Sequence, residues 1–210
     1  MKVLMVNGSP RADGSTNRAL VEIAKTLAKE GVESEIFWLS SEPIGGCKAC
    51  RFCAKNSRCV YDDKVNEFRP LAKNADGFIF GSPVYYAGAN GAISSFLDRL
   101  FYSDAFGDHN DFYLKPGAAI VAARRAGSTA AIDQLNKYFT ISQMPVISSR
   151  YWNIVFGANA QDVEKDLEGL QTMRVLAQNM AYFLRCKDAA IKAGVPLPKR
   201  EESVWTNFIR

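Results

Sequence analysis

The sequence predicts an α/β protein with a five-stranded parallel sheet, doubly wound so that helices cover both faces in a three-layer sandwich. Two observations lead to this prediction. Short apolar runs alternate with longer amphipathic stretches along the chain, and each parallel crossover needs a connection that a helix can supply. Ligands bind beyond the carboxyl ends of the strands in such sheets, so the loops that follow strands are the candidate sites.

The first half of the chain contains three of the predicted strands, at residues 3–6, 35–39 and 77–80. A helix over 15–30 separates the first two strands, because apolar residues recur there at helical spacing and Gly31 supplies a stop. A second helix over 64–74 leads into the third strand.

The second half continues the alternation. A helix over 92–102 comes first, and residues 117–123 are apolar enough for a strand buried on both faces. A helix over 129–139 precedes a fifth strand at 146–148, and the pattern allows this strand to extend to residue 155. The last predicted helix is long, 162–193, and its apolar stripe belongs in the core or at a subunit interface.

Length and composition fit one domain over residues 1–193 followed by a tail over 194–210. Hydrophobic residues at 48% and charged residues at 23% are near the globular average, which excludes a disordered chain. No apolar run approaches the ~20 residues of a membrane span, and no secretory signal is recognisable, so we expect a cytoplasmic protein without a membrane partner. The net charge of +4 is spread along the chain, so we expect no nucleic-acid partner.

The loop after the first strand is a candidate phosphate site. Glycines and hydroxyls that open a helix present backbone N–H groups and the positive end of the helix dipole to an anion. The loop lacks both the Gly-Lys-Ser/Thr of a P-loop and a G-x-G-x-x-G, so a monophosphate is the better ligand. The alternative is a turn that only caps the helix. The candidate residues are Ser9, Pro10, Arg11, Gly14, Ser15, Thr16 and Asn17.

The loop after the third strand is a candidate site for a flat ring. Aromatic and proline surfaces can stack on a ring, and glycines let backbone N–H groups reach ring heteroatoms. A surface turn is the alternative, but a phosphate loop and a ring loop together are what FMN requires. The candidate residues are Ser82, Pro83, Val84, Tyr85, Tyr86, Asn90 and Gly91.

Four of the five cysteines lie close together, at Cys47, Cys50, Cys53 and Cys59. Iron–sulfur ligation fits this spacing best, because three of these cysteines can surround one 4Fe-4S cluster and the fourth can close it. A four-cysteine zinc site and free redox-active thiols are the alternatives. Cys186, in the last predicted helix, is expected to pack as a small hydrophobe.

These motifs resemble the NADPH-dependent FMN reductase branch of the flavodoxin-like proteins, and the cysteine spacing resembles that of the related iron–sulfur flavoproteins. The resemblance covers roughly residues 1–155 and also includes Phe96-Leu97-Asp98-Arg99. It implies a flavodoxin-like FMN-binding domain, with the first loop at the FMN phosphate and the second on the isoalloxazine. It also implies that a third loop completes the ring site, with the residues Ala123, Arg124, Arg125 and Gly127. Many relatives have a Thr/Gly-rich segment where this chain has two arginines.

The expected function is that of an FMN-dependent NAD(P)H oxidoreductase, in which the flavin carries the chemistry and no side chain is assigned as catalytic. The electron acceptor is a quinone, a nitro or azo compound, free flavin or a protein. Arg124 and Arg125 can hold the phosphates of NAD(P)H or stabilise a reduced ring, and solvated arginines are the alternative. Trp205 and Phe208 in the tail suggest docking on a partner subunit, in a homodimer or homotetramer.

Two other functions stay open at this point. One is an iron–sulfur flavoprotein that carries electrons, with a 4Fe-4S cluster and a ferredoxin-type donor in place of a pyridine nucleotide. The other is a non-catalytic module that binds flavin or zinc.

Overall fold

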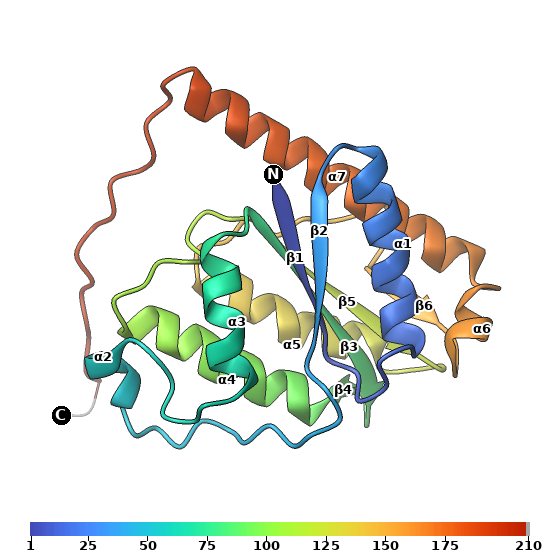
Figure 1. The fold of residues 1–210 in the computed structure, drawn as a ribbon, viewed down its shortest axis with the longest axis horizontal. Helices are drawn as coiled ribbons and strands as arrows, with labels where there is room; N and C mark the ends of the chain where they lie inside the picture. The colour runs from blue at the N-terminus through green and yellow to red at the C-terminus, as the bar shows by residue number, and fades with distance from the viewer. Residues whose placement is uncertain (209–210) are drawn as a thin grey trace.

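A computed structural model of the chain describes residues 1–208, and the last two residues of the predicted tail lie outside this range (Figure 1). The strands are β1 (Lys2–Asn7), β2 (Glu33–Trp38), β3 (Gly77–Tyr85), β4 (Gly88–Ala89), β5 (Gly117–Ala123) and β6 (Ile154–Phe156). The helices are α1 (Ser15–Lys29), α2 (Phe52–Asn56), α3 (Lys64–Lys73), α4 (Gly91–Phe106), α5 (Ser128–Ile141), α6 (Ala160–Val163) and α7 (Leu167–Lys192).

The sheet confirms the predicted fold class. Its strand order is β2-β1-β3-β5-β6, and all these neighbours pair in parallel, as in a flavodoxin-like sheet. β4 stands apart, because it only forms a short antiparallel hairpin with the end of β3. This hairpin was not predicted from the sequence.

Two layers of helices cover the sheet, and alternation along the strands divides the core between them (Figure 1). Val3 and Met5 of β1 pack on the face covered by α1 and α7. Leu4 and Val6 pack on the opposite face, under α3, α4 and α5. The predicted three-layer sandwich is therefore present, with one apolar cluster on each side of the sheet.

The fifth strand lies further along the chain than its predicted start. Val146 makes only an isolated bridge to Gly117, whereas Ile154–Phe156 pairs with the end of β5. Asn153 directs the chain there, because its side-chain amide donates to the Ala119 carbonyl at 3.0 Å and its own carbonyl accepts from the amide of Val121 at 3.0 Å. The prediction of a strand at 146–148 was wrong. The predicted extension to residue 155 includes Ile154 and Val155, the first two residues of the observed strand β6.

The predicted helix 162–193 is two helices, α6 and α7. Asp166 divides them, because its side chain accepts a hydrogen bond from the Gly169 amide at 2.9 Å and caps the start of α7. The same carboxylate accepts from the Phe156 amide at 2.6 Å, so this cap also ties α7 to β6. Among the described residues, no helix is both long and apolar enough to cross a membrane.

The tail runs back along the molecule from the end of α7 toward α2 (Figure 1). Arg200 donates to Asn110 at 2.9 Å and lies over the Tyr113 ring, and Trp205 stacks near Phe106. The tail therefore contacts its own chain around the end of α4. Docking of the tail on a partner subunit stays a prediction.

The loop between β5 and α5 depends on Gly127, which has a φ of 90°. A Cβ there would lie 2.4 Å from the Cα of Ala87 in the β3–β4 hairpin. Gly127→Ala is expected to lower the free energy of unfolding by roughly 3 kcal/mol, because left-handed strain and a backbone clash add. Urea unfolding measures the change.

Gly31→Ala is the matched control, because Gly31 also has a positive φ, of 72°, but has no atom within 4 Å of the added Cβ. Gly31→Ala should lower the free energy of unfolding by only roughly 1–2 kcal/mol, because it adds left-handed strain but no clash. If both variants lose the same amount of unfolding free energy, the contact between Gly127 and Ala87 does not matter for stability.

Candidate functional site

The three predicted loops meet around a cleft of about 210 Å³ at the carboxyl ends of β1, β3 and β5. Nine of the predicted residues line it: Ser9, Arg11, Gly14, Ser15, Thr16, Pro83, Val84, Tyr85 and Arg124. Gly157 and Ala158, which follow β6, also line the cleft and were not predicted. The signal for them was the extension of the fifth strand to residue 155, because the loop after each parallel strand lies at the same edge of the sheet.

The first loop is fixed by its own side chains. Asn7, at the end of β1, donates to the Ala12 carbonyl at 3.1 Å and accepts from the Ser9 amide at 3.0 Å. Ser9 in turn accepts from the Arg11 amide at 3.1 Å. These bonds hold the loop in one conformation, which a close-fitting anion site needs.

The first backbone N–H groups of α1 have no side-chain cap to accept their hydrogen bonds. Gly14 occupies the N-cap position and has no side chain to offer the first-turn N–H groups. The Thr16 Oγ1 is buried, lacks any hydrogen-bond partner and belongs to a residue that lines the cleft. A buried hydroxyl without a partner is costly, and a phosphate oxygen would satisfy both Oγ1 and the free amides.

Asn90 connects the first two loops. It is buried, and its side-chain amide donates to the Gly8 carbonyl at 2.8 Å while its backbone amide donates to the Ser82 Oγ at 3.0 Å. Its side-chain oxygen caps α4 by accepting from the Ile93 amide at 2.9 Å. Asn90 and Ser82 therefore hold the loops together and do not line the cleft.

The other predicted cofactor residues lie around the cleft without lining it. Tyr86 is fully exposed at the hairpin tip, with a φ of 49°, and Arg125 is exposed beside Arg124. The set outside the lining consists of Pro10, Asn17, Ser82, Tyr86, Asn90, Gly91, Ala123, Arg125 and Gly127. Among residues 1–208, Arg124 and Arg125 make neither an ion pair nor a hydrogen bond, so both guanidinium groups are free for a ligand.

The four clustered cysteines line one small hollow beyond β2, together with Tyr61 and Arg99. Cys53 is buried on α2, and Cys47 and Cys50 are exposed. Burial raises the pKa of the Cys53 thiol, and the nearby Cys59 and Cys47 thiols raise it further. In the described part of the chain, no three His, Cys, Asp or Glu side chains are arranged to hold a metal ion.

The donor set at this hollow still fits a metal–sulfur cluster, because it consists of soft sulfur ligands beside cationic side chains. The hollow is lined by all four clustered cysteines and by Lys48, Arg51 and Arg99. Cys186, by contrast, is exposed on α7, so its predicted packing role was wrong.

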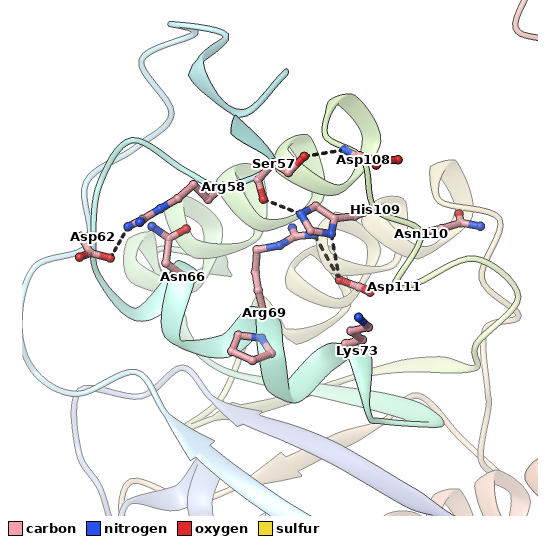
Figure 2. A pocket seen from close by; sticks show the side chains of 11 residues that line it. Ser57, Arg58, Asp62, Asn66, Arg69, Lys73, Asp108, His109, Asn110 and Asp111 are labelled. Carbon is pink, nitrogen blue, oxygen red and sulfur yellow. Dashed lines mark hydrogen bonds and ion pairs between the residues drawn. The ribbon is translucent and has the colours of Figure 1, made fainter. Parts of the chain in front are cut away.

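Another hollow, of about 630 Å³ and larger than the cleft, lies between the end of α2, α3 and residues 108–111 (Figure 2). Its charged groups are largely paired with one another: Arg58 with Asp62 at 2.6 Å, and Arg69 with Asp111 at 3.2 Å. None of the predicted cofactor residues or cysteines lines it. We therefore locate the candidate site at the strand ends.

The fold and the cleft define an α/β protein with a candidate ligand site at the carboxyl edge of its sheet. The sequence profile of the NADPH-dependent FMN reductases matches residues 1–159. An iron–sulfur flavoprotein of Methanocaldococcus jannaschii is 31% identical over 192 residues, which cover 88% of this chain and 98% of that protein. The chain belongs to the NADPH-dependent FMN reductase family, on the branch that includes the iron–sulfur flavoproteins, and is an FMN-dependent oxidoreductase.

Solved structures agree on the fold. The structure of RosB with bound 8-demethyl-8-formylriboflavin-5'-phosphate has a TM-score of 0.70 at 14% identity, over 100% of this chain and 94% of RosB. An archaeal flavodoxin has a TM-score of 0.59 at 18% identity, over 88% of this chain and 99% of the flavodoxin. The expected flavodoxin-like fold is thus confirmed.

Thr16→Val tests the role of the unpartnered hydroxyl in the cleft. Valine has the same shape but cannot bond a phosphate, so the Kd for FMN should rise roughly tenfold. The apoprotein should be as stable as the parent or more stable, because a buried hydroxyl without a partner is removed. Calorimetric titration with FMN and urea unfolding measure the two effects.

Thr26→Val is the matched control, because Thr26 is also buried on α1 but its hydroxyl already donates to the Glu22 carbonyl at 3.0 Å. It should leave FMN affinity unchanged. If both variants bind FMN as tightly as the parent protein, the Thr16 hydroxyl does not contact the phosphate.

Proposed function

We propose that this protein is an electron-transfer flavoprotein that binds FMN in the cleft and a 4Fe-4S cluster on Cys47, Cys50, Cys53 and Cys59. The observation that carries the proposal is that all four thiols line one hollow that also contains a buried arginine. When bound, the cluster supplies one-electron transfer and FMN supplies both one- and two-electron transfer.

The cleft residues divide between the two ends of FMN. The phosphate is held at the N-terminus of α1 by Ser9, Arg11, Ser15 and Thr16 of the cleft lining and by Asn17 beside it. These residues combine hydroxyls, free amides and one guanidinium. At the other end, residues 83–86 form the apolar wall against the ring and residues 123–127 close its edge. The unpartnered Thr16 Oγ1 supports this division.

The surface around the cysteines favours an acidic electron-carrier protein, such as a ferredoxin-type donor. Lys48, Arg51, Lys55 and Arg58 are all exposed there. Opposite charges steer two proteins together and increase the rate of encounter, an effect that falls with added salt. The same cations offset the negative charge of a four-thiolate cluster.

A second function, direct oxidation of NAD(P)H by the flavin, is favoured by one observation. Arg124 lines the cleft and Arg125 lies beside it, and both are exposed. Free guanidinium groups at a cleft suit the phosphates of a pyridine nucleotide. The final acceptor is then a quinone, a nitro or azo compound, free flavin or a protein. For either function we expect a homodimer or homotetramer.

Metal, sulfide and flavin analysis of protein purified without oxygen tests the cluster. For the parent protein we expect about four iron and four sulfide per FMN. Cys53→Ser should lose iron but keep FMN, because the substituted side chain lies in the cysteine hollow and not in the cleft. Cys186→Ser should keep both, since this exposed cysteine lies on α7. Zinc without iron, or no metal at all, would contradict the cluster.

Anaerobic reduction separates the two functions. If the protein is a cluster-dependent carrier, a reduced ferredoxin-type donor should bleach the flavin absorbance and NADPH alone should not. If it is an NAD(P)H oxidoreductase, NADPH should bleach it directly, and Arg124→Gln combined with Arg125→Gln should raise the KM for NADPH roughly tenfold. Failure of both donors with FMN-loaded protein would contradict both functions.

A further inference from the structure

Arg99 is the largest fully buried side chain in the described protein. It lies on α4, and its side chain is 1% exposed. A buried charge costs several kcal/mol unless it is paired and hydrogen-bonded, so its partners must compensate. Its position next to Asp98 suggests a local ion pair, but Asp98 instead accepts from the Tyr138 hydroxyl.

Asp63 orients the Arg99 guanidinium. Its two carboxylate oxygens accept from Nη1 at 2.7 Å and from Nη2 at 2.8 Å, a bidentate pair that fixes the plane of the guanidinium. Asp63 is held in turn, because its side chain caps α3 by accepting from the Val65 amide at 3.1 Å. Nη1 also donates to the Gly45 carbonyl at 3.2 Å, just before the cysteines.

The remaining edge of the guanidinium faces a cysteine. Nε and Nη2 each lie 3.2 Å from the Cys59 Sγ, so two N–H groups donate to one sulfur. The backbone of Cys59 is clamped as well, because Asn66 accepts from its amide and donates to its carbonyl, both at 3.0 Å. Two helices thus hold Cys59: Arg99 of α4 contacts its sulfur, and Asn66 of α3 contacts its backbone.

We propose that Arg99, oriented by Asp63, is a positioning residue that fixes the Cys59 sulfur and sets the reduction potential of the metal–sulfur cluster. This inference rests on the proposed function. N–H groups donated to a ligating sulfur withdraw electron density, and a buried positive charge favours the more negative reduced state. Both effects raise the potential, so the pair Asp63–Arg99 controls how readily the cluster accepts an electron.

Redox titration of the cluster in the FMN-loaded protein tests the inference. Arg99→Gln removes the charge and most of the donors. The equilibrium between oxidised and reduced cluster should therefore shift about tenfold toward the oxidised form, which lowers the reduction potential by about 59 mV for one electron. Arg99→Lys keeps the charge but loses the planar fork, so its potential should lie between those of Arg99→Gln and the parent.

Asp63→Asn should shift the potential in the opposite direction. It removes the negative charge that balances Arg99 while leaving an acceptor for the guanidinium, so the cluster hollow becomes more positive and the potential rises. A general loosening of the fold would move both variants the same way. Opposite signs therefore distinguish an electrostatic effect from a structural one, and shifts of the same sign would overturn the inference.

Arg69→Lys and Arg69→Gln are the matched controls. Arg69 is also buried, on α3, and pairs with Asp111 at 3.2 Å (Figure 2). It also donates to Ser103 at 2.8 Å, and no cysteine is among its hydrogen-bond partners. These variants should lose stability. Because Ser103 also lines the cysteine hollow, Arg69→Gln should lower the potential as well, but by much less than Arg99→Gln. If Arg99→Gln and Arg69→Gln give the same potential as the parent, Arg99 does not act on the cluster.

Two outcomes separate this inference from the proposed function. A parent protein without iron would overturn the proposed function itself. A parent protein with a full cluster and an unchanged potential in every Arg99 and Asp63 variant would overturn only the role of Arg99. If Arg99→Gln cannot retain iron, the signs of the shifts in Arg99→Lys and Asp63→Asn decide the question.

Discussion

The hydrogen bonds of one buried side chain, Asn90, hold the cleft together. Its side-chain amide bonds the loop after β1, 82 residues away in the sequence, and its side-chain oxygen caps the start of α4. Its backbone amide bonds the Ser82 side chain near the end of β3. The two loops also touch directly, because the Gly8 amide donates to the Gly81 carbonyl at 2.9 Å. A Cβ on Gly8 would lie 2.8 Å from that carbonyl, so the approach is possible only with glycine there. The shape of the cleft follows from this contact.

Much of the fold could be predicted because it depends on local patterns. The apolar runs of β1, β3 and β5 are buried on both faces over most of their length, and their shortness and the glycines and loop residues that bound them favour strands over helices. The short elements escaped prediction for a physical reason. β4 has two residues and α2 has five, too few for a period to show. β6 depends on Asn153 bonding across to β5, a contact between segments distant in sequence.

The candidate site was predictable in part for the same reason. Hydroxyls and glycines mark a loop that leads into a helix, so the lining residues of the first loop were found. Sequence could not separate residues that line the cleft from residues that brace it, because Asn90 and Ser82 belong to the same short motif as Pro83 and Tyr85. The cysteine spacing similarly indicated a type of chemistry, but the Asp63–Arg99 pair spans two helices and has no local pattern.

The end of β2 connects the two halves of the proposed redox site. Trp38 is its last residue, and the indole N–H donates to the Ser9 carbonyl at 2.8 Å, within the loop assigned to the phosphate. The chain then continues directly into the segment that bears the cysteines. We therefore expect the emission of Trp38, one of three tryptophans in the chain, to change when a ligand occupies this loop.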